Sequence, residues 1–180
     1  MLNLNVLNIC AYTAFLFSCS VFEEAVLKLI GSHCEIHTFD PDASYGANAP
    51  PGVTYHAWGF TSEQEAEQGN FKTMNQTVKE LNHTGRTIDI FKIDCEGCEW
   101  TTFGGWFSAG ATLRQILVEV HNTPDEAPNF FLSMQEAGYV TFHKEPNIQH
   151  GGGKCVEYAF LKLEKTFFQD SSNVLEEEMK

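Results

Sequence analysis

The chain has 180 residues, of which 43% are hydrophobic, and a formal net charge of −13. This length is enough for one domain with a buried core, and the composition excludes disordered and fibrous proteins. The negative charge argues against a protein that grips phosphate backbones through clustered Lys and Arg, so we expect no nucleic acid partner.

An apolar segment without charge stands near the start of the chain. Residues 6–22 read VLNICAYTAFLFSCSVF, and no basic residue precedes Lys28. The run is slightly short for a membrane span, so membrane contact is a disfavoured alternative. Ser18-Cys19-Ser20 resembles a signal-peptide cleavage site, although a basic region before the apolar run is missing. We interpret residues 1–20 as either an atypical first strand or a signal-like segment, and both a cytoplasmic and a secretory location stay open.

Helices and strands alternate after this segment. We predict helices and strands in the following order: a helix over 23–31, strands over 34–40 and 54–60, a helix over 71–85, a strand over 88–94, a helix over 99–107, a strand over 114–121, a helix over 129–138, and strands over 139–145 and 156–163. This alternation predicts an α/β fold with a mostly parallel sheet, and the last two strands suit an antiparallel hairpin. The layout resembles that of Rossmann-like methyltransferases, with a domain over 21–163 and an acidic tail over 164–180.

Acidic side chains follow two of these expected strands. Ligands of such sheets bind beyond the carboxyl ends of the strands. Asp40 ends the second expected strand, where an acid accepts hydrogen bonds from a ribose diol, and the alternative is a turn acid before proline. Asp94 ends the strand IDIFKID. Glu96 and Glu99 follow it, and the simplest explanation for both is the favourable effect of acids at a helix N-terminus.

A carboxylate and an imidazole share one face of the strand over 114–121. Glu119 and His121 are two residues apart, so they point to the same side. A buried carboxylate needs a partner, and an ion pair with Lys92 on the neighbouring strand is the structural explanation for Glu119. His121 lies nearer the edge of the sheet, which it shares with Asp94.

The segment FKIDCEGCEW, at residues 91–100, contains a CxxC pair. A zinc knuckle usually needs two such pairs, and acids beside both thiols oppose redox catalysis. A disulfide from Cys95 or Cys98 to Cys155 is a further alternative, because the last strand begins at the same edge of the sheet. We expect no metal site, and we keep open a metal-binding protein that uses these three cysteines and His121.

The same segment resembles the KIDxEGxE motif of FkbM-like methyltransferases. It is closer to the methyltransferase-like (METTL-type) branch, in which DCEGCEW precedes an LVEVH-like strand and a CVEYAFLKL-like last strand. HTFDP, at residues 37–41, is similar to the end of that family's second strand. The resemblance covers residues 20–163. It implies a class I S-adenosylmethionine-dependent fold with O-methylation as the typical reaction.

The resemblance also implies roles for the residues at the sheet edge. Asp40 would hold the ribose of S-adenosylmethionine, and Asp94, with Glu96 close by, would lie beside its methionine portion. A sulfonium and an ammonium suit an acidic edge. A base helps a hydroxyl acceptor, and we expect His121 as the first candidate and Glu119 as the next. We expect a small-molecule or glycan acceptor.

One departure from the family pattern concerns the first strand. In the family it leads into a glycine-containing loop, but this chain has no glycine before Gly31. Phe15, Leu16 and Phe17 carry side chains that would crowd a close approach of the backbone to a cofactor. The alternative function is therefore a catalytically silent methyltransferase-like protein that acts by binding or is secreted.

Overall fold

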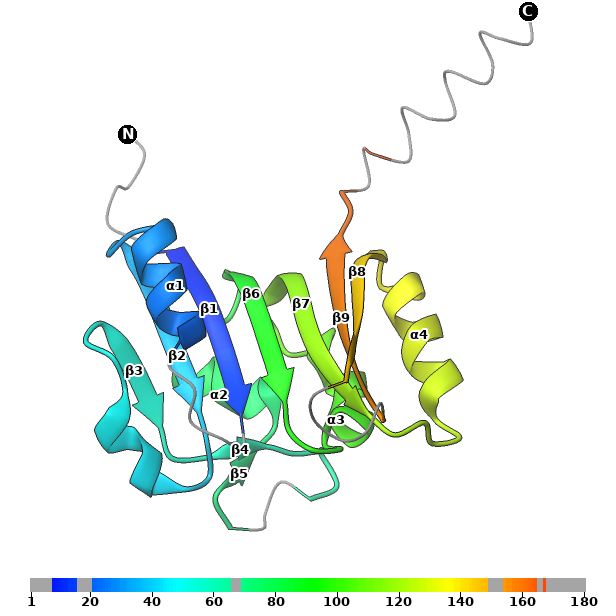
Figure 1. Ribbon diagram of the computed structural model, residues 1–180, viewed down its shortest axis with the longest axis horizontal. Helices are drawn as coiled ribbons and strands as arrows, with labels where there is room; N and C mark the ends of the chain where they lie inside the picture. The colour runs from blue at the N-terminus through cyan, green and yellow to red at the C-terminus, as the bar shows by residue number, and fades with distance from the viewer. Residues whose placement is uncertain (1–7, 16–20, 66–68, 149–153, 165–166, 168–180) are drawn as a thin grey trace, which may run out of the picture.

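A seven-stranded sheet forms the centre of the fold (Figure 1). The computed structural model describes residues 8–15, 21–65, 69–148, 154–164 and 167. The strand order is β3-β2-β1-β6-β7-β9-β8. These strands are β1 (Asn8–Phe15), β2 (Cys34–Phe39), β3 (Val53–His56), β6 (Thr87–Asp94), β7 (Thr112–His121), β8 (Tyr139–Asn147) and β9 (Cys155–Lys162).

The direction of the strands confirms the predicted α/β class. Strands β3, β2, β1, β6 and β7 are parallel to one another. Strand β9 is antiparallel to both β7 and β8. The sheet is therefore mostly parallel and carries the expected antiparallel hairpin at its C-terminal side.

The apolar segment near the start of the chain supplies an interior strand of the sheet. β1 lies between β2 and β6, and Ile9, Ala11 and Tyr12 are at most 1% exposed. Residues 16–20, where the family has its glycine loop, lie outside the described residues, as does most of the expected acidic tail. Among the described residues, the fold contains no helix with the length and apolar character needed to cross a membrane.

Helices cover both faces of the sheet. α1 (Val21–Leu29) connects β1 to β2, whereas α3 (Glu99–Trp106) connects β6 to β7. The strand order runs in opposite directions in these two units, so right-handed crossovers put the two helices on opposite faces. α2 (Met74–Glu80) and α4 (Ala127–Glu136) each contact α3 and complete its layer. The larger core lies under this layer and is rich in aromatic side chains, including Phe39, Phe91, Trp106, Phe130 and Phe160.

Two predicted elements differ from the structure. The strand expected over 54–60 is divided into β3 and a short strand β4 (Gly59–Phe60), which pairs with β5 (Phe71–Lys72). The helix expected over 71–85 therefore begins later, after Thr73. The Thr73 hydroxyl accepts a hydrogen bond from the Gln76 backbone, and the Gln76 side chain accepts one from the Thr73 backbone. This capping box fixes the start of α2.

The cysteine pairing differs from the expected one. Disulfides join Cys10 to Cys34 and Cys95 to Cys98, and Cys155 is free and buried. The prediction of a bond from the CxxC pair to Cys155 is wrong, because β7 lies between β6 and β9. The tight turn instead brings the Cα atoms of Cys95 and Cys98 to 5.3 Å, within the range that a disulfide needs.

Candidate functional site

The carboxyl ends of the parallel strands meet along one edge of the sheet, at the lower side of Figure 1. The chain continues from β1 to its neighbour on one side and from β6 to its neighbour on the other. Such a reversal between adjacent strands opens a crevice where sheets of this kind bind ligands. The sequence-predicted site residues lie at this edge in two groups, one after β2 and one after β6 and β7.

The first group consists of Asp40 alone, and its carboxylate is buried. It is 5% exposed, and one carboxylate oxygen, Oδ1, accepts a hydrogen bond of 2.8 Å from the Asp42 backbone. The other oxygen, Oδ2, is buried and has no hydrogen-bond partner. Burial raises the pKa of this carboxyl, and the Asp42 hydrogen bond offsets part of the rise. A buried hydrogen-bond acceptor without a donor is costly in a folded protein, so Oδ2 is available to accept a hydrogen bond from a ligand.

Glu23, in the first turn of α1, repeats this arrangement. It is 2% exposed, and its Oε1 accepts a hydrogen bond from the Thr13 hydroxyl of β1. Its Oε2 is buried without a partner. Of the three such side-chain atoms in the described part of the chain, two are therefore carboxylate oxygens near β1 and β2, and the third belongs to Trp106.

His121, at the end of β7, is held by a buried acid. Glu99 is fully buried, and its Oε1 lies 2.7 Å from the His121 backbone nitrogen and 3.1 Å from the ring nitrogen Nδ1. With Nδ1 donating to a carboxylate, the tautomer is fixed and the lone pair is on Nε2. Glu99 was expected to act only on the helix N-terminus, so this role is a finding of the structure.

Three further carboxylates surround Nε2 of His121. It lies 3.6 Å from Oδ1 of Asp94, 3.6 Å from Oε2 of Glu96 and 4.0 Å from Oε1 of Glu119. Burial and the neighbouring Glu119 raise the pKa of Asp94 to about 6, although the charge of Lys92 opposes this. Four of the five predicted site residues therefore come together here, and Asp40 stands apart from them.

Glu119 also has a partner that the sequence did not suggest. Asn147, at the end of β8, donates a hydrogen bond of 3.0 Å to its Oε1. Glu119 is 6% exposed, so this bond helps to satisfy a carboxylate that is costly to bury. The predicted ion pair between Glu119 and Lys92 stays a prediction, although the charge of Lys92 lowers the pKa of the neighbouring Asp94.

The CxxC turn explains how these acids reach the same place. Glu96 and Gly97 both have left-handed backbones, with φ of 54° and 115°. Glycine adopts such a conformation without strain, whereas a glutamate does so rarely. The Gly97 backbone donates a hydrogen bond of 2.9 Å to Oε2 of Glu99. The Cys95–Cys98 disulfide closes the turn, so Asp94, Glu96 and Glu99 all face His121.

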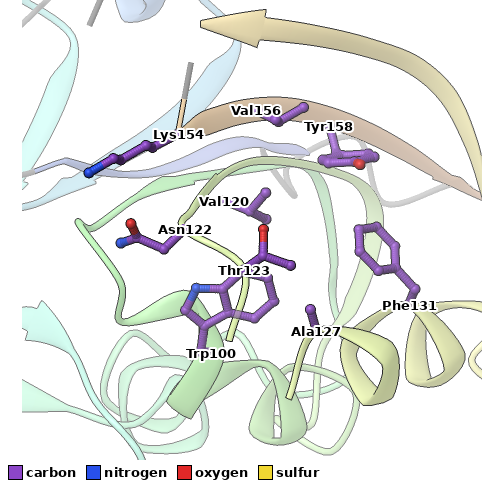
Figure 2. Close-up of a pocket in the computed structure, with 9 residues that line it drawn as sticks. All are labelled: Trp100, Val120, Asn122, Thr123, Ala127, Phe131, Lys154, Val156 and Tyr158. Carbon is purple, nitrogen blue, oxygen red and sulfur yellow. The ribbon is translucent and has the colours of Figure 1, made fainter. Parts of the chain in front are cut away.

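A cavity of about 410 Å³ lies near the end of β7, between β7, β9 and the helices α3 and α4 (Figure 2). Aromatic rings of Trp100, Phe131 and Tyr158 form its walls, and Asn122 and Lys154 add polar groups on one side. The Trp100 indole donates a hydrogen bond of 2.8 Å to the His121 carbonyl. Trp100 also packs against the larger core, so it links the cavity wall to both the core and the end of β7.

Two solved structures share this fold. A putative rRNA-methylase from Clostridium thermocellum has 13% sequence identity and a TM-score of 0.51, with 88% of this chain and 89% of that chain covered. The N-methyltransferase NodS from Bradyrhizobium japonicum WM9 has 8% identity and a TM-score of 0.51, with 87% and 88% covered. At these identities the likeness shows the fold. A comparison with curated proteins found no match.

The expected absence of a nucleic acid partner needs correction. The fold is shared with a putative rRNA-methylase, so neither the fold nor a net charge of −13 justifies that exclusion. Net charge averages over the whole surface, whereas contacts to phosphates depend on local groups of Lys and Arg.

The strand order, the acidic edge and the buried carboxylate after β2 agree with the expected class of protein. A family model described as a methyltransferase domain matches residues 17–162, which is most of the chain. The chain belongs to this family of methyltransferase domains.

Proposed function

We propose that this protein transfers a methyl group from S-adenosylmethionine to an acceptor oxygen, as a member of the FkbM-like, METTL-type branch. The observation that carries the proposal is the orphaned Oδ2 of Asp40, which is buried at the end of β2 beside the reversal in strand order. The DCEGCEW segment after β6 supports the assignment to this branch.

The residues after β1 and β2 fit the cofactor. S-adenosylmethionine supplies an electrophilic methyl group on a sulfonium, together with a ribose diol and an ammonium. Asp40 would accept a hydrogen bond from the diol at Oδ2, which has no donor among the residues that the structure describes. The free oxygen of Glu23 offers a second acceptor near β1. Asp94 and Glu96 would face the positively charged methionine portion.

His121 is the proposed base for the acceptor hydroxyl. Glu99 holds Nδ1 and leaves Nε2 able to take a proton. This pairing of a base with an orienting carboxylate is the arrangement that activates nucleophiles in many enzymes. Glu119, whose Oε1 lies 4.0 Å from Nε2, is the second candidate for the base. General base catalysis of this kind contributes about 10²–10⁴-fold to a rate.

The cavity in Figure 2 is the proposed site for the acceptor. Its volume of about 410 Å³ falls in the usual range for ligand pockets, which is roughly 300–1,000 Å³. The walls formed by Trp100, Phe131 and Tyr158 suit a planar group. Lys154 and Asn122 can bind its polar substituents, and the bond from the Trp100 indole to the His121 carbonyl fixes the cavity wall at the end of β7.

The location is proposed from the cysteines. Disulfides persist in oxidising compartments and are rare in the cytosol. Two disulfides among six cysteines therefore favour the secretory pathway over the cytoplasm.

Calorimetric titration with S-adenosylmethionine tests the proposal. Asp40→Ala should weaken binding by about 10- to 100-fold, because a hydrogen bond to a charged group contributes about 1.5–3 kcal/mol. Asp89→Ala is the matched control, since Asp89 pairs with Arg114 near the amino ends of β6 and β7. His121→Ala should bind the cofactor nearly as well as the parent.

Two results would count against the proposal. Equal weakening by Asp40→Ala and Asp89→Ala would show that the cofactor lies elsewhere. A folded parent that does not bind S-adenosylmethionine would favour the catalytically silent alternative, in agreement with the missing glycine before Gly31.

A further inference from the structure

Nitrogen, sulfur and oxygen donors converge where β7 ends and β9 begins. One donor atom from each of Glu119, His121 and Cys155 lies within 4.8 Å of the other two. The three residues are 6%, 6% and 8% exposed. The antiparallel register places Cys155 directly opposite His121, and Glu119 is two residues earlier on the same face of β7. The regular sheet therefore holds all three donors in place.

The spacing around Nε2 of His121 suits ligands of one metal ion better than hydrogen bonds. Its nearest carboxylate oxygens, on Asp94 and Glu96, are 3.6 Å away, and Oε1 of Glu119 is 4.0 Å away. Hydrogen bonds between such atoms measure about 2.7–3.2 Å. Zinc–ligand bonds of about 2.0–2.3 Å in a tetrahedron place neighbouring ligands roughly 3.3–3.8 Å apart. A small shift of the Glu119 side chain would complete that geometry.

The negative charges on β7, β8 and β9 near these three donors favour the binding of a cation. Glu119 is directly opposite Glu157 on β9, and Glu157 is directly opposite Glu145 on β8. Like charges in directly opposed pairs destabilise a sheet. A divalent cation would relieve this repulsion between the strands.

We propose that Glu119, Nε2 of His121 and Sγ of Cys155 bind a zinc-class divalent cation, with the fourth position facing Asp94 and Glu96. A thiolate, an imidazole and a carboxylate together suit Zn²⁺ and disfavour Mg²⁺ and Ca²⁺, which take oxygen ligands. Cys95 and Cys98, the metal ligands considered from the sequence, are bonded to each other and are not donors.

The hydrogen bonds behind these ligands support the assignment. A metal-bound histidine usually donates its other ring nitrogen to a carboxylate, which orients the ring. Nδ1 of His121 lies 3.1 Å from Oε1 of Glu99 in this way. Asn147 similarly orients Glu119 through a bond of 3.0 Å. A cysteine binds a metal as the thiolate, so metal binding at Cys155 must release its proton.

A second set of possible metal donors in the described residues differs from the first, because its nitrogen atoms already have partners in the protein. Glu35, His37 and His83 also lie within 4.8 Å of one another. However, both ring nitrogens of each histidine already have partners, because His83 contacts Tyr12 and Glu35 while His37 contacts His56 and Glu35. That set is satisfied within the protein, whereas the described carboxylate oxygens nearest to Nε2 of His121 are 3.6 Å away, which is too long for a hydrogen bond.

The cation and the proposed base use the same lone pair. Zn²⁺ on Nε2 would prevent His121 from accepting a proton, so metal occupancy should inhibit any methyl transfer that depends on this base. The metal site itself goes beyond the proposed function, because the ligands bind the ion without a cofactor or an acceptor.

Cobalt spectroscopy and zinc calorimetry on the disulfide-bonded protein test the site. Co²⁺ should give the visible bands of a tetrahedral ion together with a near-ultraviolet thiolate-to-cobalt band, and Zn²⁺ should displace it. Cys155→Ser should abolish the thiolate band. Glu99→Gln should weaken Zn²⁺ binding by about 10- to 100-fold, and His121→Ala by at least as much. His143→Ala is the matched control, since this histidine on β8 is 60% exposed at its side chain.

The outcomes separate this site from the proposed function. A parent with no thiolate-to-cobalt band, or a band that Cys155→Ser retains, would overturn the proposal. Equal loss of Zn²⁺ affinity in His143→Ala and His121→Ala would do the same. Circular dichroism of each variant confirms that it is folded. None of these measurements uses S-adenosylmethionine, so a failure to bind the cofactor leaves the metal result standing.

Discussion

Replacing Glu99 by glutamine should cost stability because this buried carboxylate satisfies three donors. Its oxygens accept bonds from the backbone nitrogens of Gly97 and His121, at 2.9 and 2.7 Å, and from Nδ1 of His121, at 3.1 Å. Glutamine keeps the shape but replaces one oxygen by an amide NH₂. At least one N–H then faces another donor instead of an acceptor.

The expected loss can be estimated from these bonds. An unsatisfied buried donor costs about 1–3 kcal/mol, and the remaining bonds weaken when the acceptor loses its charge. The free energy of unfolding of Glu99→Gln should therefore fall by about 2–4 kcal/mol, which corresponds to roughly 4–16 °C in Tm. Urea unfolding followed by circular dichroism measures the free energy directly.

Glu96→Gln provides the control in the same turn. The Glu96 side chain is 52% exposed, so its change should stay within about 0.5 kcal/mol of the parent. If Glu99→Gln unfolds at the same urea concentration as Glu96→Gln, then Glu99 does not hold His121 as the distances indicate, and both proposals that use this histidine would lose their support.

Two further predictions concern the cysteines and the histidines of the core. For the five cysteines that the structure describes, mass spectrometry of unreduced peptides should find the disulfides Cys10–Cys34 and Cys95–Cys98 and a free Cys155. A peptide that links Cys155 to another of these cysteines would contradict the fold. Burial lowers the pKa of His56 to about 4, so the unfolded state binds its proton first and stability falls as the pH drops from about 6.5 towards 4. The free energy of unfolding of His56→Phe, measured in urea and compared with that of the parent, should therefore rise by about 1–2 kcal/mol as the pH falls from 7.5 to 4.5, after allowance for partial exposure. A difference that stays constant across this range would refute the lowered pKa of His56.

The sequence predicts the fold well because its signals are local. The strands IDIFKID and RQILVEVH lie in the structure as β6 and β7, since short apolar runs between polar turns leave few alternatives. Their parallel direction follows from the helix between them. That same reasoning brings Asp94 and His121 to one edge of the sheet, where the structure places them 3.6 Å apart.

The sequence does not predict contacts that depend on side-chain direction or on distant pairing. Glu99 looks like an ordinary acid in the first turn of a helix, and its contact with His121 depends on the left-handed turn at Glu96 and Gly97. The Cys10–Cys34 bond joins neighbouring strands whose register is irregular next to Cys10. Glu23 gives no signal of its own, because a free buried oxygen is visible only when the packing around it is known.

The free oxygens of Asp40 and Glu23 bear on the choice between an active protein and a silent one. A buried carboxylate oxygen without a donor destabilises the fold and gives nothing in return while the protein is alone. Strain of this kind is typical of functional sites, where a ligand offsets it. Both oxygens lie near β1 and β2, where we propose that the cofactor binds, and the missing glycine is a feature of the sequence before Gly31. A protein that had no use for the cofactor would gain stability from neutral or apolar residues at these two positions. Asp40 and Glu23 are therefore better explained by ligand binding than by a silent fold.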